Sequence, residues 1–232
     1  MKFLQNPLPA LSRREKYIGT LYLAFQWILL PTLLRLIAEA FGIATSGTLI
    51  NVLYFAINFI CCIAIFGNLS KQSFCQSREN PERLLFGAAV GFGVHRVASI
   101  VVSLFTALLL PDFVNLNDES LVSILGDYPV LMMISTVFLA PVAEELFYRG
   151  LVFGWLREKN VTLAYILSAL IFASLHVMQY IGIYSPLQVV VALVRYLPAG
   201  IIFAWAYQYS GSIFAPILIH AVNNLLAILI VR

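Results

Sequence analysis

The chain has 232 residues, of which 61% are hydrophobic and only 11% are charged, and its mean hydropathy is +0.92. A soluble domain carries roughly 25% charged residues, so this chain would expose an extensive apolar surface in water. The net charge of +3 comes with no basic run, so we expect no nucleic-acid partner. The three cysteines form neither a metal motif nor a disulfide framework. These features predict an integral membrane protein surrounded by the lipid bilayer.

Long apolar runs recur along the whole chain. A membrane-spanning helix needs about 20 mostly apolar residues, and runs of that kind lie at 18–42, 48–67, 84–110, 129–153, 161–180, 187–208 and 213–231. The sequence therefore predicts an all-α, polytopic transmembrane helical bundle with about seven spans, or eight if one long run divides. The first run is longer than the apolar segment of a signal peptide, so we expect it to be a retained helix.

The loops between these runs differ in charge. Basic residues lie before the first run, between the second and third, and between the fourth and fifth: Lys2, Arg13, Arg14 and Lys16, then Lys71, Arg78 and Arg83, then Arg157 and Lys159. The opposite loops are neutral or acidic, with Asp112, Asp118, Glu119 and Asp127. Basic loops stay in the cytoplasm, so we expect a cytoplasmic N-terminus, an external C-terminus and residence in the plasma membrane. The loop 111–128 separates an N-terminal region of three spans (1–127) from a C-terminal region of four (128–232).

The fourth run contains two adjacent carboxylates and a cation. Ionisable groups inside a membrane are costly and are a functional hypothesis by default. Adjacent helical residues point about 100° apart, so we expect Glu144 and Glu145 to have different roles. Glu145 and Arg149 have the i, i+4 spacing of an ion pair, which leaves Glu144 without a local cation. Poor solvation would make Glu144 a stronger base. The alternative is a charged cluster at the membrane surface.

Two further runs carry histidines. His176 follows Phe172 by four residues, so the two share a helix face and Phe172 is expected to fix the imidazole. His220 and Asn224 share a face in the last run, where an imidazole and an amide can bind a metal or donate hydrogen bonds to an oxyanion. Both histidines could instead make only interhelical hydrogen bonds. Taken together, the residues indicate a water activated by a general base or by a divalent metal.

Other polar groups in the apolar runs are His95, Arg96 and Arg195, and we expect them to be structural or to line a cavity. At about 1.5 Å per residue, Glu144 and His220 are expected nearer the cytoplasmic face and His176 nearer the outer face.

Three motifs now stand in order along the chain: Glu144-Glu145-x-x-x-Arg149, Phe172-x-x-x-His176 and His220-x-x-x-Asn224. They resemble the signatures of the CPBP group, which comprises CAAX prenyl endopeptidases and bacteriocin-processing or immunity proteins and is also called the Abi family. The resemblance covers residues 128–232, and the first 127 residues carry no motif of this group. It implies a four-helix catalytic core of an intramembrane endopeptidase in the C-terminal half.

The resemblance also implies roles for individual residues. Glu144 would activate the water with the help of His176, while His220 and Asn224 would stabilise the oxyanion. Glu145, Arg149 and Phe172 would support them. Members of the group are usually named metalloproteases, so the resemblance implies a divalent metal such as zinc, with Glu144, His176 and His220 as its ligands; whether that metal takes part in catalysis stays open. The implied substrate is a membrane-associated peptide or protein, with a prenylated C-terminus or a bacteriocin-like leader.

Two other functions stay open at this point. A non-catalytic immunity or scaffold protein of the same fold would not need a base, so it does not explain the intact motifs. A small transporter could use the intramembrane Glu and His residues as a proton relay.

Overall fold

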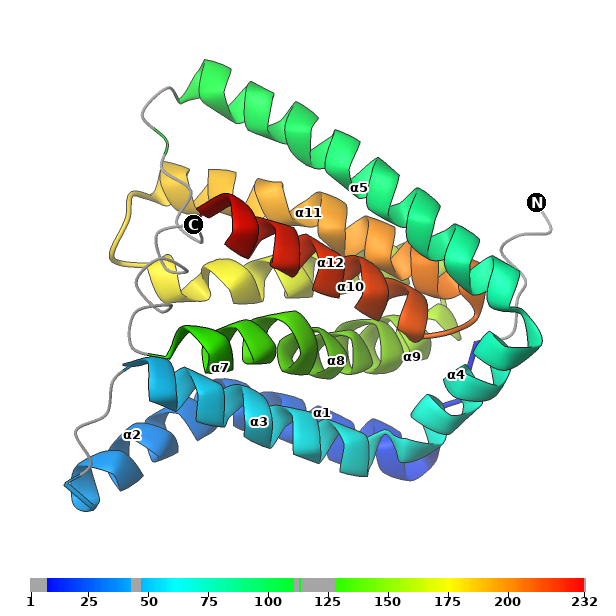
Figure 1. The fold of residues 1–232 in the computed structure, drawn as a ribbon, viewed down its shortest axis with the longest axis horizontal. Helices are drawn as coiled ribbons and strands as arrows, with labels where there is room; N and C mark the ends of the chain where they lie inside the picture. The colour runs from blue at the N-terminus through cyan, green and yellow to red at the C-terminus, as the bar shows by residue number, and fades with distance from the viewer. Residues whose placement is uncertain (1–7, 43–46, 111–112, 114–127, 232) are drawn as a thin grey trace.

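A computed structural model describes residues 8–42, 47–110, 113 and 128–231, and these residues form a bundle of helices (Figure 1). Its α-helices are α1 (Arg13–Ile28), α2 (Leu30–Ala40), α3 (Gly47–Ile65), α4 (Gly67–Glu79), α5 (Pro81–Leu109), α7 (Pro129–Ile134), α8 (Ala140–Glu145), α9 (Gly154–Arg157), α10 (Val161–Val177), α11 (Pro186–Ser210) and α12 (Phe214–Val231). Two π-helical segments, η2 (Ser135–Leu139) and η3 (Leu146–Phe153), and a 3-10 turn, η4 (Met178–Tyr180), complete them. The described ranges contain no β-strand, and the predicted all-α membrane bundle is confirmed.

The number of spans is lower than the seven or eight predicted. Among the residues that the structure describes, five helices are long and apolar enough to cross a membrane: α3, α5, the continuous helix Pro129–Arg157, Val161–Tyr180 and α11. The pair α1 and α2 becomes a sixth span if it is counted as one, although it bends by 52°. Pro31 is one of the first two residues of α2. Its ring has no N–H and clashes with the carbonyl four residues earlier, and this breaks the predicted first span.

The last predicted span, 213–231, is a shorter apolar helix in the structure. Gly211 ends α11 with a φ of 74°, a left-handed conformation that glycine adopts without a steric cost. Ser212 in the same turn is fully buried, and its Oγ lies 2.7 Å from Oγ of Ser77 on α4. Because α4 covers this turn, α12 begins inside the protein and not at its edge.

The N-terminal helices pack against the C-terminal region. In Figure 1, α5 runs across α11 and α12, while α1 and α3 lie along the other side of the helix that contains α7 to α9. One apolar core joins the two regions, with Cys62, Phe66 and Leu69 against Phe147 and Leu151. The described N-terminal helices therefore flank the helices that carry the motifs on two sides.

The three basic segments meet at one end of the bundle. Nζ of Lys16 at the start of α1 lies 2.7 Å from Oε2 of Glu158, directly after α9. The side chain of Gln72 on α4 makes hydrogen bonds with both backbone groups of Ala10, at 2.9 and 3.1 Å. This clustering agrees with the predicted loop asymmetry. The acidic residues of the predicted external loop, Asp112, Asp118, Glu119 and Asp127, lie outside the described residues.

Candidate active site

The helix that carries the two carboxylates is irregular on both sides of them. In η2 the N–H of Ala140 donates to the carbonyl of Ser135, and at the end of η3 the N–H of Gly154 donates to the carbonyl of Arg149. Both bonds span five residues instead of four, which is the π-helical pattern. Pro141 is the second residue of the short α8 between them and has no backbone N–H to donate. π-segments of this kind are frequent at functional sites, and here they set the direction of the carboxylates on α8.

Glu145 and Arg149 form a completely buried ion pair. Nη1 of Arg149 lies 2.9 Å from Oε1 of Glu145, and both side chains are 0% exposed. Nη2 of Arg149 also donates to the backbone carbonyls of Ala199 at 3.2 Å and Gly200 at 3.3 Å. The guanidinium lies over the ring of Phe172, 4.3 Å from its centroid. The pair predicted from the spacing is confirmed, and it ties the fourth span to α10 and α11.

His220 contacts the same carboxylate, which the sequence did not predict. Its Nδ1 lies 2.9 Å from Oε1 of Glu145, and its Nε2 lies 3.9 Å from Oε2 of Glu144. The ring packs against Phe172 and Phe203, with centroid distances of 6.0 and 5.3 Å. Each glutamate therefore faces a different nitrogen of one buried imidazole.

His176 is held by its own helix. Its Nδ1 lies 2.8 Å from the carbonyl oxygen of Phe172, and the two rings are 4.4 Å apart. Since a carbonyl only accepts, Nδ1 carries the hydrogen and Nε2 is left to face the site. Tyr196 of α11 packs on the other side, at 4.5 Å. The contact expected between Phe172 and the imidazole is confirmed.

The expected difference in depth between Glu144 and His176 is wrong, because Nε2 of His176 lies 3.6 Å from Oε2 of Glu144. The two residues lie at similar distances from the end of the bundle where α9 ends and α10 begins. His176 is about 22 Å along α10 from Val161, and Glu144 is about 20 Å from Arg157, at about 1.5 Å per residue. Because α12 begins beneath α4 and not at the edge of the bundle, His220 lies deeper than its position in the last run suggested.

Glu144 differs from its neighbour in having no direct partner among the described residues. Its side chain is 23% exposed, and within the described part of the chain its buried Oε2 has no hydrogen-bond partner. The nearest nitrogens are Nε2 of His176 and Nε2 of His220, at 3.6 and 3.9 Å. These separations are too long for direct hydrogen bonds, and polar groups at such distances are commonly bridged by a water.

Asn224 lies one helical turn beyond His220 and points its amide at the fourth span. Its Nδ2 donates to the carbonyl of Thr136 in η2 at 2.9 Å. The neighbouring Asn223 accepts from Nη1 of Arg96 on α5 at 3.5 Å. The amides therefore link α12 to both flanking elements.

The same set of side chains contains the donors that a metal would need. Glu144, His176 and His220 are residue types that zinc takes. Within the described residues, however, no group of three His, Cys, Asp or Glu side chains has the arrangement of a metal site. The zinc ion stays a prediction from the sequence.

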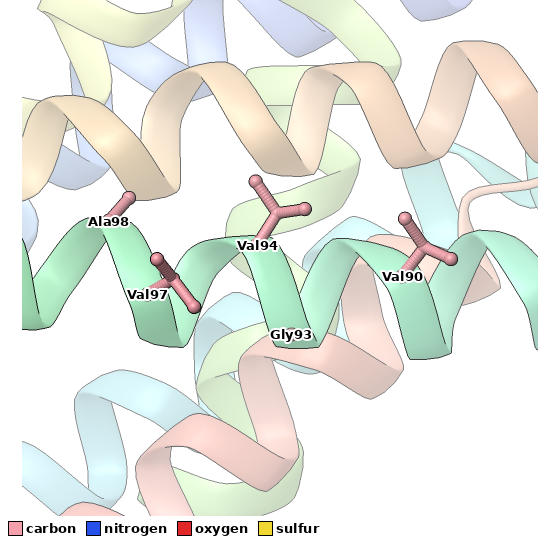
Figure 2. Close-up of a pocket in the computed structure, with 5 residues that line it drawn as sticks. All are labelled: Val90, Gly93, Val94, Val97 and Ala98. Carbon is pink, nitrogen blue, oxygen red and sulfur yellow. The ribbon is translucent and has the colours of Figure 1, made fainter.

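A hollow of about 440 Å³ lies elsewhere, along the outer side of α5 (Figure 2). It is apolar and is lined by Val90, Gly93, Val94, Val97 and Ala98. A second hollow shares Val90 and Val94 and reaches Trp205 on α11. Neither hollow is lined by a residue of the three motifs. The motif residues lie instead between the packed helices of the bundle.

Comparison with known proteins supports the resemblance. Residues 126–226 match the family described as Rce1-like, type II CAAX prenyl endopeptidase Rce1-like. A relative from Bacillus subtilis (strain 168), named "Putative membrane peptidase YdiL", is 28% identical over 109 residues, which are 47% of this chain and 40% of the relative. The chain thus spans two fifths of the length of this curated relative. No solved structure matches the chain. The range of the family match includes all seven motif residues.

Proposed function

We propose, on the premise that the C-terminal half of the chain belongs to the CPBP family, that the protein is an intramembrane endopeptidase. The family match and the curated relative support a membrane protease at the level of the family. One observation carries the proposal for this chain. The carboxylate of Glu144 forms no ion pair with the described Lys and Arg residues and faces the Nε2 atoms of two histidines. The carboxylate of Glu145, in contrast, contacts Arg149 and His220 directly.

In the proposed reaction, Glu144 is the general base. A water between Oε2 of Glu144 and Nε2 of His176 would donate a hydrogen to each, because both atoms are acceptors in the ionised and neutral side chains. Its oxygen then points a lone pair at the substrate. The oxygen attacks the peptide carbonyl carbon as Glu144 takes the proton, and the protonated Glu144 returns that proton to the leaving nitrogen.

His220 and Asn224 would stabilise the oxyanion of the tetrahedral intermediate. The carboxylate of Glu145 accepts from Nδ1 of His220, so donation from Nε2 requires the doubly protonated imidazolium. Oε1 of Glu145 lies 2.9 Å from both Nη1 of Arg149 and Nδ1 of His220, so the buried ion pair fixes the orientation of the imidazole. Glu145 and Arg149 therefore act as positioning residues for His220, and Phe172 acts in the same way for His176.

The substrate class follows from the family and from the depth of the site. A base that lies between spanning helices requires a peptide that enters the membrane or is anchored to it. The description of the matched family favours a prenylated C-terminus, and a bacteriocin-like leader peptide is the second candidate. Either would be extended in the site, so that its carbonyl lies beside Glu144.

Quantitative proteomics of peptide termini in membranes tests the proposal even while the substrate is unidentified. Cells with the wild-type chain should contain cleaved termini that are missing with Glu144→Gln, a variant that keeps the shape of the side chain and removes the base. Glu158→Gln, on an exposed carboxylate, is the matched control and should behave as wild type. Identical termini in wild type and Glu144→Gln would overturn the assignment. A phenotype that survives both Glu144→Gln and His176→Gln would favour the non-catalytic alternative.

A further inference from the structure

The short helix α4 lies outside the spans and at the end of the bundle. It connects the end of α3 to the start of α5, both of which are long enough to cross a membrane, and it is not itself a candidate span. Figure 1 shows α4 at the same end as the start of α1 and the end of α9. Because α3 leaves the hydrocarbon layer where α4 begins and α5 enters it where α4 ends, α4 lies at the level of the lipid headgroups.

One face of α4 is fixed to the protein by polar contacts. The N–H of Leu69 donates to Oε1 of the buried Glu15 at 2.9 Å, and Ser77 contacts Ser212 at 2.7 Å. Gln72 adds its two bonds to Ala10. These contacts join α4 to the N-terminal segment and to the turn before α12, so the helix cannot rotate without breaking them. The opposite face of α4 therefore keeps a fixed direction, away from these contacts.

That other face, which we call the α4 outer face, consists of Lys71, Phe74 and Arg78. Their spacings of three and four residues place the side chains in one row on the helix, and all three are exposed. Phe74 is 54% exposed, between two cations. No ion pair within the described residues neutralises Lys71 or Arg78. An aromatic ring flanked by cations is the pattern of a helix that lies in the membrane interface.

We propose that the α4 outer face binds the headgroups of anionic lipids. The ring of Phe74 would enter the boundary between headgroups and acyl chains, and Lys71 and Arg78 would contact lipid phosphates on either side of it. Charge complementarity selects anionic lipid, because the two cations on this face have no acidic partner in the part of the chain that the structure describes. The surface adds a lipid-binding site to the chain, separate from the motif residues between the spans.

Native mass spectrometry of the purified full chain tests this proposal. The protein is titrated with phosphatidylglycerol or with phosphatidylcholine in detergent. Wild type should bind phosphatidylglycerol more tightly, and K71Q/R78Q should weaken that binding by about 30-fold, since each cation near an anionic surface contributes about a factor of five. Phosphatidylcholine binding should not change in this variant. Phe74→Ser should weaken the binding of both lipids, because the ring contacts the acyl boundary that they share.

The matched control is R13Q/R14Q, which removes two exposed cations at the same end of the bundle and outside α4. It should retain most of the preference for phosphatidylglycerol. A second measurement needs no variant: raising the salt from about 50 to about 500 mM should weaken phosphatidylglycerol binding to wild type through charge screening. The proposal is overturned if wild type binds both lipids equally, as expected of a face that binds a protein partner. It is also overturned if the control loses as much affinity as K71Q/R78Q.

Discussion

Removing one partner of the buried ion pair between Glu145 and Arg149 should strongly destabilise the protein, and Arg149→Met tests this. Methionine fills much of the same space between the helices and removes the cation. The carboxylate of Glu145 would then be buried at 0% exposure with only His220 beside it, and the carbonyls of Ala199 and Gly200 would lose their donor. Removing one partner of a buried pair costs about 3–5 kcal/mol in the free energy of unfolding.

The assay is denaturation of the purified protein in mixed detergent micelles, which gives a free energy of unfolding for each variant. Lys16→Met is the control, because Lys16 and Glu158 form a partly exposed pair that is slightly shorter, at 2.7 Å against 2.9 Å. Breaking such a pair should cost only about 0–1 kcal/mol. Glu145→Leu/Arg149→Met should be less destabilised than the sum of its two single variants, since it leaves no unpaired buried charge. Equal small losses for Arg149→Met and Lys16→Met would refute the reasoning.

Three further predictions concern packing and chemistry. Gly200→Ala should lower stability by about 1–3 kcal/mol, because the new Cβ would lie 2.7 Å from Cα of Ala169. Gly93→Ala should not lower stability in this way, because no atom lies within 4 Å of its new Cβ. Thermal unfolding of both variants checks this. His220→Gln should reduce kcat more than it raises KM, because an oxyanion contact forms only in the transition state; a change confined to KM would contradict that role. If zinc is bound as the sequence predicts, a chelator should abolish cleavage and added zinc should restore it. Metal analysis should then find less bound zinc in Glu144→Ala than in wild type. Full activity of the metal-free protein would contradict this cofactor.

Local spacing predicted the parts of the site that lie within one helix. The i, i+4 relation identified the pair of Glu145 with Arg149 and the contact of Phe172 with His176, because the helix repeat fixes which side chains share a face. The contact between Glu145 and His220 joins residues 75 positions apart. It depends on how α12 packs against the fourth span, and no local pattern encodes that.

The number of spans was overestimated for a related reason. Hydropathy locates apolar runs but does not tell how their helices pack inside the protein. The run at 213–231 is apolar throughout, yet its turn at Ser212 is buried beneath α4, a contact between distant segments. The break in the first run had a visible local cause in Pro31, which favours the start of a new helix.

The rate of peptide cleavage by the reconstituted protein tests the central claim most directly. A peptide identified from the termini lost in Glu144→Gln cells would be incubated with wild type, Glu144→Gln and Glu158→Gln in proteoliposomes. We predict that Glu144→Gln cleaves it at least about 100-fold more slowly, as expected for loss of a general base, and that Glu158→Gln cleaves it at the wild-type rate. Cleavage by folded Glu144→Gln at the wild-type rate would contradict the account.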